Sequence, residues 1–204
     1  MNRRAHWDLV YTTKQPNEVS WYQPSPLRSL ELLREAGAGP HTTLIDIGGG
    51  DSTLVDAVVA DQLGAITVLD ISGAALARAR ARLGDRAREV TWLEDDATRV
   101  ALPAAAFDIW HDRAVFHFLT DAEDRARYVT TAAAALKPGG ALIIATFAED
   151  GPQRCSGLDV TRYSAAQLAQ TLGEPFQLRR SFHDVHHTPS GGEQRFSYCV
   201  FRRQ

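Results

Sequence analysis

Short apolar runs alternate with amphipathic segments along the chain as far as residue 147. Five runs are rich in β-branched residues, which is typical of strands buried on both faces: TTLIDI, AITVLDI, VTWLE, FDIWHD and ALIIATF. Three segments between them have apolar residues at helical spacing: STLVDAVVADQL, GAALARARARLG and DAEDRARYVTTAAAAL. This alternation predicts an α/β fold, a mostly parallel sheet with helices on both faces.

The pattern changes after Phe147. Two longer strand-like runs, FQLRRSFHDVHH and EQRFSYCVFRR, flank the turn signal TPSGG. They predict a C-terminal antiparallel hairpin at the edge of the sheet. The chain of 204 residues, 44% of them hydrophobic, fits one domain with its own core.

Composition excludes several classes of protein. The formal net charge of −3 provides no basic field for nucleic acid. Cys155 and Cys199 are far apart, which argues against a disulfide framework or a structural zinc site and favours a reducing compartment. The N-terminus lacks the apolar region of a signal peptide, and no stretch approaches the ~18 apolar residues of a membrane span. We therefore expect a cytoplasmic protein with no nucleic-acid or membrane partner.

A glycine-rich turn marks the expected ligand site. Gly48, Gly49 and Gly50 follow the first predicted parallel strand and precede a helix that starts near Ser52, the position at which open α/β sheets bind ligands. Asp70 ends the next predicted strand, where a carboxylate accepts hydrogen bonds from ribose hydroxyls. Alternatively, the glycines only turn the chain and Asp70 only caps a helix. The combination favours a nucleotide-like ligand.

The kind of nucleotide follows from the motif. A dinucleotide fingerprint requires a third glycine where this chain has Thr53, which counts against NAD. The first motif of the class I S-adenosylmethionine-dependent methyltransferases reads acid-x-Gly-x-Gly, and Asp46, Gly48 and Gly50 match it. The sequence resembles this family along nearly its whole length, through Asp70 and three further motifs: LEDDA (93–97), FDIWHDRAVFHFL (107–119) and LKPGG (136–140).

The resemblance implies a single-domain Rossmann-like methyltransferase fold over residues 1–204, with a seven-stranded sheet. Within it we expect an N-terminal helical cover (1–38), a cofactor-binding core (39–147), and a substrate loop with the C-terminal hairpin (148–204). The implied cofactor is S-adenosyl-L-methionine, and no metal is required.

The family's cofactor-binding roles carry over by position. Asp46 would orient the glycine loop or the cofactor's ammonium, Asp70 would take the ribose hydroxyls, and Asp96 would accept from the adenine amino group. Glu94 and Asp95 are alternatives to Asp96. Many relatives have a third glycine at the position of Ser52, which is tolerant of change. The expected cofactor-binding residues are Tyr11, Trp21, Asp46, Gly48, Gly49, Gly50, Ser52, Asp70, Ile71, Asp95, Asp96, Ala97 and His111.

The N-terminal segment HWDLVYTTKQPNEVSWYQPSP resembles the segment that folds over the cofactor in thiopurine-type small-molecule methyltransferases and in some protein-lysine methyltransferases. Aromatic faces stabilise a sulfonium cation and exclude water. Trp7, Tyr11, Trp21 and Tyr22 are candidates, and we favour Tyr11 and Trp21. Alternatively, these rings only pack a first helix against the sheet.

Residues near the fourth strand are candidates for acceptor chemistry. His111 and Asp112 are the candidate catalytic residues, with a cofactor contact and a helix cap as their alternatives. The candidate substrate-binding residues are Arg113, His117, Arg154 and Arg162. For His117 the alternative is simple packing, and for the last two arginines it is a solvated surface position. Cys155 is a further candidate for the pocket. The histidines of HDVHH (183–187) fit a surface strand better than a metal site.

Three functions remain open from the sequence. The first is methylation of a small molecule on sulfur, oxygen or nitrogen, and the N-terminal resemblance favours a thiol. The second is protein-lysine methylation, although those relatives commonly carry an acid-Lys-Gly-Thr motif where this chain reads HDRAV. The third is a non-catalytic, S-adenosylmethionine-binding regulatory protein. The sequence makes no prediction of the oligomeric state.

Overall fold

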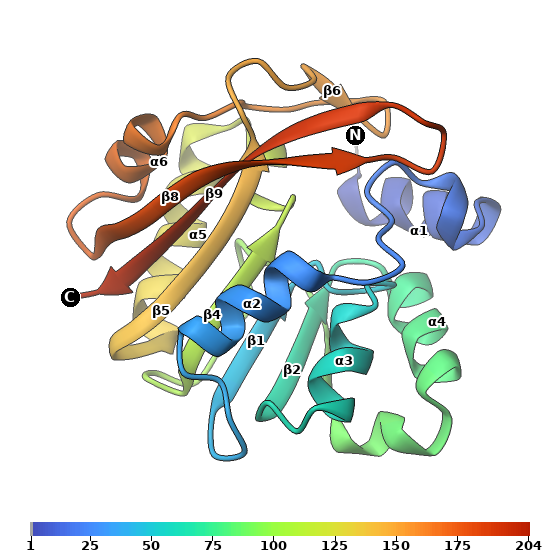
Figure 1. The fold of residues 1–204 in the computed structure, drawn as a ribbon, viewed down its shortest axis with the longest axis horizontal. Helices are drawn as coiled ribbons and strands as arrows, with labels where there is room; N and C mark the ends of the chain where they lie inside the picture. Colours follow the sequence, from blue (N-terminus) through green and yellow to red (C-terminus); the bar gives the residue numbers. More distant parts are fainter. Residues whose placement is uncertain (1) are drawn as a thin grey trace.

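The computed structural model describes residues 2–204, and seven strands form its main sheet in the order β3-β2-β1-β4-β5-β9-β8 (Figure 1). These strands are β1 (Thr43–Ile47), β2 (Ala65–Asp70), β3 (Thr91–Glu94), β4 (Phe107–Arg113), β5 (Leu136–Phe147), β8 (Phe176–His187) and β9 (Glu193–Arg203). The first five pair in parallel, whereas β9 runs antiparallel to both β5 and β8. The predicted parallel sheet and C-terminal hairpin are confirmed.

Helices lie on both faces of this sheet. Their bounds are α1 (Arg3–Thr13), α2 (Leu27–Glu35), α3 (Leu54–Ala60), α4 (Gly73–Leu83), α5 (Ala122–Ala135) and α6 (Ala165–Leu172). Three 3-10 turns, η1 (Pro16–Glu18), η2 (Gly84–Glu89) and η3 (Phe116–Phe118), and a short hairpin of β6 (Arg154–Cys155) and β7 (Leu158–Asp159) complete the fold. Local chemistry sets the helix starts: the Asp121 carboxylate accepts from the backbone N–H groups of Glu123 and Asp124 at the start of α5.

Two apolar cores separate the sheet from its helices. The core on one face combines alternate strand residues with apolar side chains of α2, α3 and α4. The core on the other face combines the intervening strand residues with α5 and α6. Leu44 and Ile45, neighbours in β1, belong to different cores, as the alternation of side chains along a strand requires.

The N-terminal segment divides into two parts with different positions. Leu30 and Leu33 of α2 are buried in the core that α2 shares with α3 and α4, so α2 is part of the helical layer. Helix α1 instead lies near the carboxyl ends of β1 and β2 (Figure 1). The expectation of one helical cover over residues 1–38 therefore needs correction, because only α1 and the segment after it overlie the carboxyl edge.

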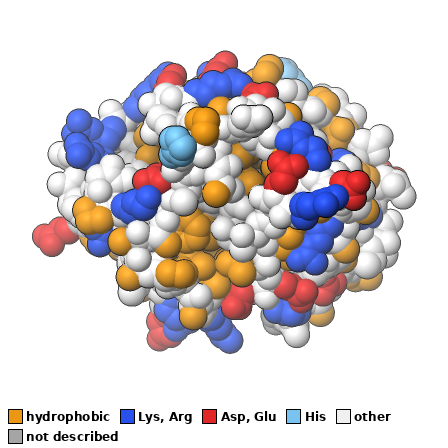
Figure 2. All heavy atoms as spheres, turned by 90° about the horizontal axis from the view of Figure 1, so that it is seen from below, with side chains coloured by type: hydrophobic (Ala, Val, Ile, Leu, Met, Phe, Trp, Pro, Cys, Tyr) orange, Lys and Arg blue, Asp and Glu red, His pale blue; other side chains and the backbone are white. Residues whose placement is uncertain are grey.

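The opposite edge of the molecule, at which β1 begins, is shown in Figure 2. Basic and acidic side chains are interspersed on this face with apolar ones. Among residues 2–204, no helix combines the length and the apolar character that crossing a membrane requires.

Candidate active site

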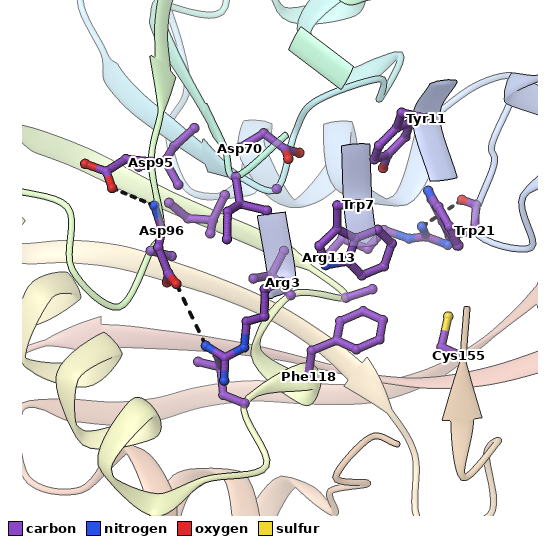
Figure 3. Close-up of a pocket in the computed structure, with 18 of the residues that line it drawn as sticks. Arg3, Trp7, Tyr11, Trp21, Asp70, Asp95, Asp96, Arg113, Phe118 and Cys155 are labelled. Carbon is purple, nitrogen blue, oxygen red and sulfur yellow. Dashed lines mark hydrogen bonds and ion pairs between the residues drawn. The ribbon is translucent and has the colours of Figure 1, made fainter. Parts of the chain in front are cut away.

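Two adjoining cavities open at the carboxyl edge of the parallel strands. The aromatic cavity, of about 860 Å³, is bounded by Trp7, Trp21, Asp70, Asp95, Asp96, Arg113, Phe118, Phe147, Cys155 and Phe196 among others (Figure 3). The polar cavity, of about 670 Å³, is bounded by Ser29, Asp46, Gly49, Ser52 and His111 among others. Both cavities share Tyr11, Trp21, Ile47, Gly48 and Arg113, so they form one continuous site around the end of β1.

The glycine loop after β1 is tightly enclosed by side chains. Gly48 has a φ of +66°, and a Cβ at this position would collide with Val115. A Cβ on Gly49 would collide with the carboxylate of Asp46, and one on Gly50 would collide with that of Asp70. Three successive glycines are therefore needed for the loop to pass between the two acids.

Asp70 occupies the carboxyl end of β2, directly beneath this loop. Its carboxylate accepts from the backbone N–H groups of Gly50 at 3.0 Å and Ser72 at 2.8 Å. Burial raises the pKa of Asp70 to about 7; the two backbone hydrogen bonds oppose this shift, and the charges of Asp46 and Asp8 add to it. Asp70 is thus a preorganised but poorly solvated acceptor at the cavity wall.

Asp46 belongs to a buried chain of polar groups. Nδ1 of His111 donates to its Oδ1 at 2.7 Å, and Nε2 of His111 lies 2.9 Å from the hydroxyl of Ser29. All three side chains are buried. Oδ2 of Asp46 has no hydrogen-bond partner among the described residues. A buried carboxylate oxygen without a donor is costly, so this atom is suited to an N–H or ammonium group of a ligand.

The acids after β3 contact the first turn of α1. One oxygen of Asp96 accepts from the N–H (2.9 Å) and the hydroxyl (2.7 Å) of Thr98, while the other lies 3.9 Å from the guanidinium of Arg3. Asp95 accepts from the backbone N–H of Asp96, and its side chain turns away from the cavity centre (Figure 3). Of these two acids, Asp96 is better placed to meet a ligand.

Aromatic rings from α1 and the following segment roof the site. Trp7 packs edge-to-face against Trp21 (5.7 Å between centroids) and Phe118 (5.1 Å). Burial, followed by the charge of Asp70, raises the pKa of Tyr11 well above its usual range, so this phenol stays neutral. Tyr22, by contrast, borders only the polar cavity.

A family model for the methyltransferase domain matches residues 45–144, which include the glycine loop, Asp70, Asp96 and His111. The chain belongs to the class I S-adenosylmethionine-dependent methyltransferases. S-Adenosylmethionine is therefore its methyl donor. A search of curated proteins finds no significant match to this methyltransferase.

Solved structures share the fold of the methyltransferase at low sequence identity. One, described for the conversion of a disulfide bond into a thioacetal group during echinomycin biosynthesis, has a TM-score of 0.79 and 20% identity and covers 98% of this chain and 93% of its own. The Burkholderia thailandensis 1,6-didemethyltoxoflavin-N1-methyltransferase has bound 1,6-didemethyltoxoflavin and S-adenosylhomocysteine. It has a TM-score of 0.70 and 18% identity, and the match covers 98% of this chain and 84% of its own. A putative sarcosine dimethylglycine methyltransferase from Galdieria sulphuraria has a TM-score of 0.70 and 14% identity over 97% of each chain.

The methyltransferase brings nearly all of the expected cofactor-binding residues to this site. Gly50 borders neither cavity, but its backbone N–H donates to the carboxylate of Asp70 and so helps to fix that side chain at the cavity wall. Ser52 borders the polar cavity, where its hydroxyl accepts from the N–H of Leu54 at the start of α3. Ser29 was missed in the sequence, although it precedes Leu32 and Leu33 on the apolar stripe of α2 and so occupies a buried position.

Asp112, predicted to be catalytic, lies on the face of β4 that packs against α5. It is fully buried and accepts from the hydroxyl of Tyr128 (2.6 Å) and the backbone N–H groups of Val115 (2.9 Å) and Phe116 (3.1 Å). Burial raises its pKa to about 6 against these hydrogen bonds. Asp112 borders neither cavity, so the structure corrects its assignment to that of a group that holds the turn after β4.

Three of the predicted substrate-binding residues also lie outside both cavities. His117 is buried between Phe118 and Phe147, and burial lowers its pKa to about 3. Arg154 is largely exposed and pairs with Asp159 at 3.0 Å, while Arg162 donates to the carbonyl of Gly151 at 3.2 Å. Both arginines therefore stabilise the loop after β5. Of the four predicted substrate-binding residues, the site includes only Arg113.

The histidines of β8 are also separate from the site. His186 donates to the backbone carbonyl of Ser20 at 2.7 Å, and His187 lies near Glu193 at 3.5 Å. Within residues 2–204, no three histidine, cysteine or carboxylate side chains gather as they would around a metal ion.

Proposed function

We propose that this methyltransferase methylates a small-molecule acceptor, and that the atom methylated is a sulfur. The observation that carries the proposal is the aromatic cavity, a concave and mostly apolar pocket beside the glycine loop with a few polar side chains on its wall, as is typical of small-molecule sites. Its wall extends from the acids beside the glycine loop to the aromatic rings around Arg113 (Figure 3). The bound heterocycle of the toxoflavin N1-methyltransferase supports a small-molecule acceptor, and the sulfur chemistry of the echinomycin protein supports a sulfur atom.

The residues of the site fit S-adenosylmethionine. Oδ2 of Asp46, buried and without a partner, suits the ammonium group, while Asp70 suits the ribose hydroxyls. Asp96 suits the adenine amino group, and the backbone N–H of Ala97 suits a ring nitrogen. Ile71 adds apolar wall at this end. Gly48–Gly50 let the backbone come close to the methionine part.

The cofactor supplies an electrophilic methyl group on a sulfonium. The protein's task is to hold the acceptor in line with that methyl group and to exclude water. Trp7, Tyr11 and Trp21 border the cavity beneath α1 and provide aromatic surface that favours a cation. Positioning and the aromatic roof therefore account for catalysis without proton transfer by the protein.

The side chains around the aromatic cavity favour sulfur as the acceptor atom. Among the described residues no histidine borders this cavity. His111 borders the adjoining polar cavity, where Asp46 and Ser29 already pair with both of its ring nitrogens, and Asp112 and His117 are buried elsewhere. An acceptor here must become nucleophilic without a nearby histidine base. A thiol with a pKa of about 8.5 is partly ionised at neutral pH, whereas a hydroxyl is not. A protonated amine would face the positive charges of Arg113 and the sulfonium.

The first test is binding of the cofactor. We expect calorimetry to show binding of S-adenosylmethionine and S-adenosylhomocysteine, with NAD at least about 100-fold weaker, a difference of about 2.7 kcal/mol. The physical reason is that a pyrophosphate would approach Asp46, Asp51 and Asp70 around the loop, and Thr53 stands at the third glycine position. Tight NAD binding without a response to S-adenosylmethionine would contradict the assignment of this site.

The second test compares acceptor atoms in otherwise matched molecules. We expect transfer of a labelled methyl group to 4-methylbenzenethiol at a rate at least about tenfold above that to 4-methylphenol or 4-methylbenzylamine at pH 7.5, because the thiol is appreciably ionised whereas the phenol is not and the amine is protonated. A protein-lysine substrate mixture serves as a further comparison. Preference for the phenol, the amine or a protein would overturn the assignment to sulfur.

A further inference from the structure

Arg113 is a cation without an anionic partner. Its Nε donates to the hydroxyl of Tyr198 at 3.2 Å and NH1 donates to the backbone carbonyl of Trp21 at 3.0 Å, while the guanidinium lies 4.8 Å from the ring centroid of Phe196. None of these groups is negatively charged. NH2 is buried and has no hydrogen-bond acceptor among the described residues, and none of the ion pairs found within residues 2–204 includes Arg113. Such a group favours an external anion.

The surroundings of Arg113 do not supply the missing charge. Burial lowers the pKa of both His117 and His186, and the charge of Arg113 lowers them further, so these two histidines stay neutral. Burial likewise raises the pKa of the Cys155 thiol, which is therefore not an anion at neutral pH. The positive field of Arg113 thus extends over this end of the cavity without compensation.

The position of Arg113 separates it from the acids that suit the ribose and the adenine. Asp70, Asp95 and Asp96 lie on one side of the aromatic cavity, and Arg113, Trp21 and Cys155 lie on the other (Figure 3). The guanidinium leaves the end of β4 in the direction of β9, where the hydroxyl of Tyr198 accepts from it and the ring of Phe196 packs against it. This direction leads to the region left for the acceptor.

The charge that Arg113 binds is not that of the reacting atom. An ionised thiol loses its negative charge as the methyl group is transferred, so a cation beside the sulfur would stabilise the reactant more than the transition state and slow the reaction. A substituent that keeps its charge throughout has no such penalty. A planar carboxylate also matches the geometry of a guanidinium.

We propose that the acceptor is an aromatic molecule bearing a negatively charged substituent, which the guanidinium of Arg113 binds while Trp7, Phe118 and Phe147 contact its ring. Trp7 and Phe118 meet edge-to-face, and Phe147 packs against Phe196 at 4.9 Å between centroids, so flat surfaces border this end of the cavity. The inference rests on the proposed function, since it concerns the same site. It makes Arg113 the residue that determines acceptor specificity.

The experiment is a binding comparison between two probes of one shape. Calorimetry measures the affinity of 4-mercaptobenzoate and of 4-mercaptobenzamide for the full-length protein, with and without saturating S-adenosylhomocysteine. The two probes share the same thiol and differ in one substituent, which is a carboxylate in the first and an uncharged amide in the second. We expect the carboxylate to bind at least about tenfold more tightly, as one charged hydrogen-bonded pair allows.

Three variants test which residue causes this preference. Arg113→Gln is expected to reduce the affinity ratio of the two probes to about one without weakening the binding of S-adenosylhomocysteine. Arg113→Lys is expected to keep part of the preference because the charge remains. Arg154→Gln is the matched control: Arg154 is exposed outside the cavity, so the full preference should persist. If Arg113→Gln fails to fold, the intact protein and Arg113→Lys still decide the question.

Equal affinity of the two probes for the intact protein, including no binding of either, would overturn the inference, as would an unchanged preference in Arg113→Gln. Loss of S-adenosylhomocysteine affinity in Arg113→Gln with the preference intact would assign the guanidinium to the cofactor instead. Each of these results leaves the proposed sulfur methylation standing. Failure of S-adenosylhomocysteine to bind the intact protein would instead remove the proposed cofactor site, while the probe preference is still measured without it.

Discussion

Replacing Asp70 by alanine is expected to weaken S-adenosylmethionine binding by about 100-fold or more and to leave the sheet folded. A hydrogen bond to a charged acceptor contributes about 1.5–3 kcal/mol, so losing two ribose hydroxyl contacts costs on the order of 3 kcal/mol or more. The variant also frees the N–H groups of Gly50 and Ser72, which now fix the loop above the cofactor. Calorimetry of the purified variant measures the effect.

The matched control for this change is Asp85→Ala. The Asp85 side chain is almost fully exposed and lies in η2, away from both cavities, so its removal should leave cofactor affinity within about twofold. An unchanged dissociation constant in Asp70→Ala would mean that the carboxyl end of β2 does not meet the ribose.

The same carboxylate should give the protein a measurable pH dependence. Burial raises the pKa of Asp70 from 3.8 to about 7, so between these values the folded protein holds a proton that the unfolded chain has released. Stability therefore falls as pH rises from about 4 to 7, because ionisation is disfavoured only in the folded state. Asp70→Asn does not titrate in this range. Urea unfolding at pH 4.5, 6 and 7.5 should show wild type losing stability relative to this variant, by at most about 4 kcal/mol.

The strand pattern of the sequence was sufficient to predict the fold. TTLIDI and FDIWHD became β1 and β4 because both faces of these strands are covered by apolar helices, which a continuous apolar run anticipates. The fifth strand was expected over ALIIATF (141–147), but β5 begins earlier, at the LKPGG motif, because Leu136 pairs with Phe107 of β4. Local sequence does not set that length, since pairing with neighbouring strands does.

The side chains at the end of β4 show where the sequence prediction of the site was incomplete. Residues alternate between the two faces of a strand, so His111 and Arg113 point to the side of the cofactor cavities and Asp112 points to Tyr128 of α5. This alternation, applied to HDR, separates the site residues from the structural one. The partner of His111 could not be predicted from the sequence, because Ser29 lies 82 positions earlier in the chain and meets His111 only after α2 docks on the sheet.

The largest effect on turnover is expected from helix α1. Its attachments are polar as well as aromatic: Arg3 pairs with Asp124, Arg4 pairs with Glu94 at 2.5 Å, and Asp8 accepts from the hydroxyl of Ser72 at 2.7 Å. The buried residues of α1 belong to neither of the two apolar cores, and water replaces exposed ion pairs at low cost, so we expect α1 to open more easily than the sheet. Opening would admit the cofactor, and closure would place Trp7 and Tyr11 over it.

Truncation provides the direct test of this cover. A chain that begins at Gln15 should keep its sheet, because it retains α2, whose buried leucines belong to the core shared with α3 and α4. It should lose at least about 100-fold in turnover through loss of positioning and water exclusion. Trp7→Ala should reproduce much of this loss in the full-length protein. Leu9→Ala is the matched control, since Leu9 is 62% exposed on the same helix and borders neither cavity.

Hydrogen exchange on the intact protein separates a moving cover from a fixed helix. If α1 opens and closes over the site, S-adenosylhomocysteine should slow amide exchange in residues 3–13 more than in α6. Helix α6 serves as the reference because it packs into the core that it shares with α5. Binding stabilises the closed state because the ligand contacts α1 only when it is closed. Full turnover in the truncated chain, or exchange in α1 that ignores the ligand, would show instead that Trp7 and Tyr11 are ordinary packing residues.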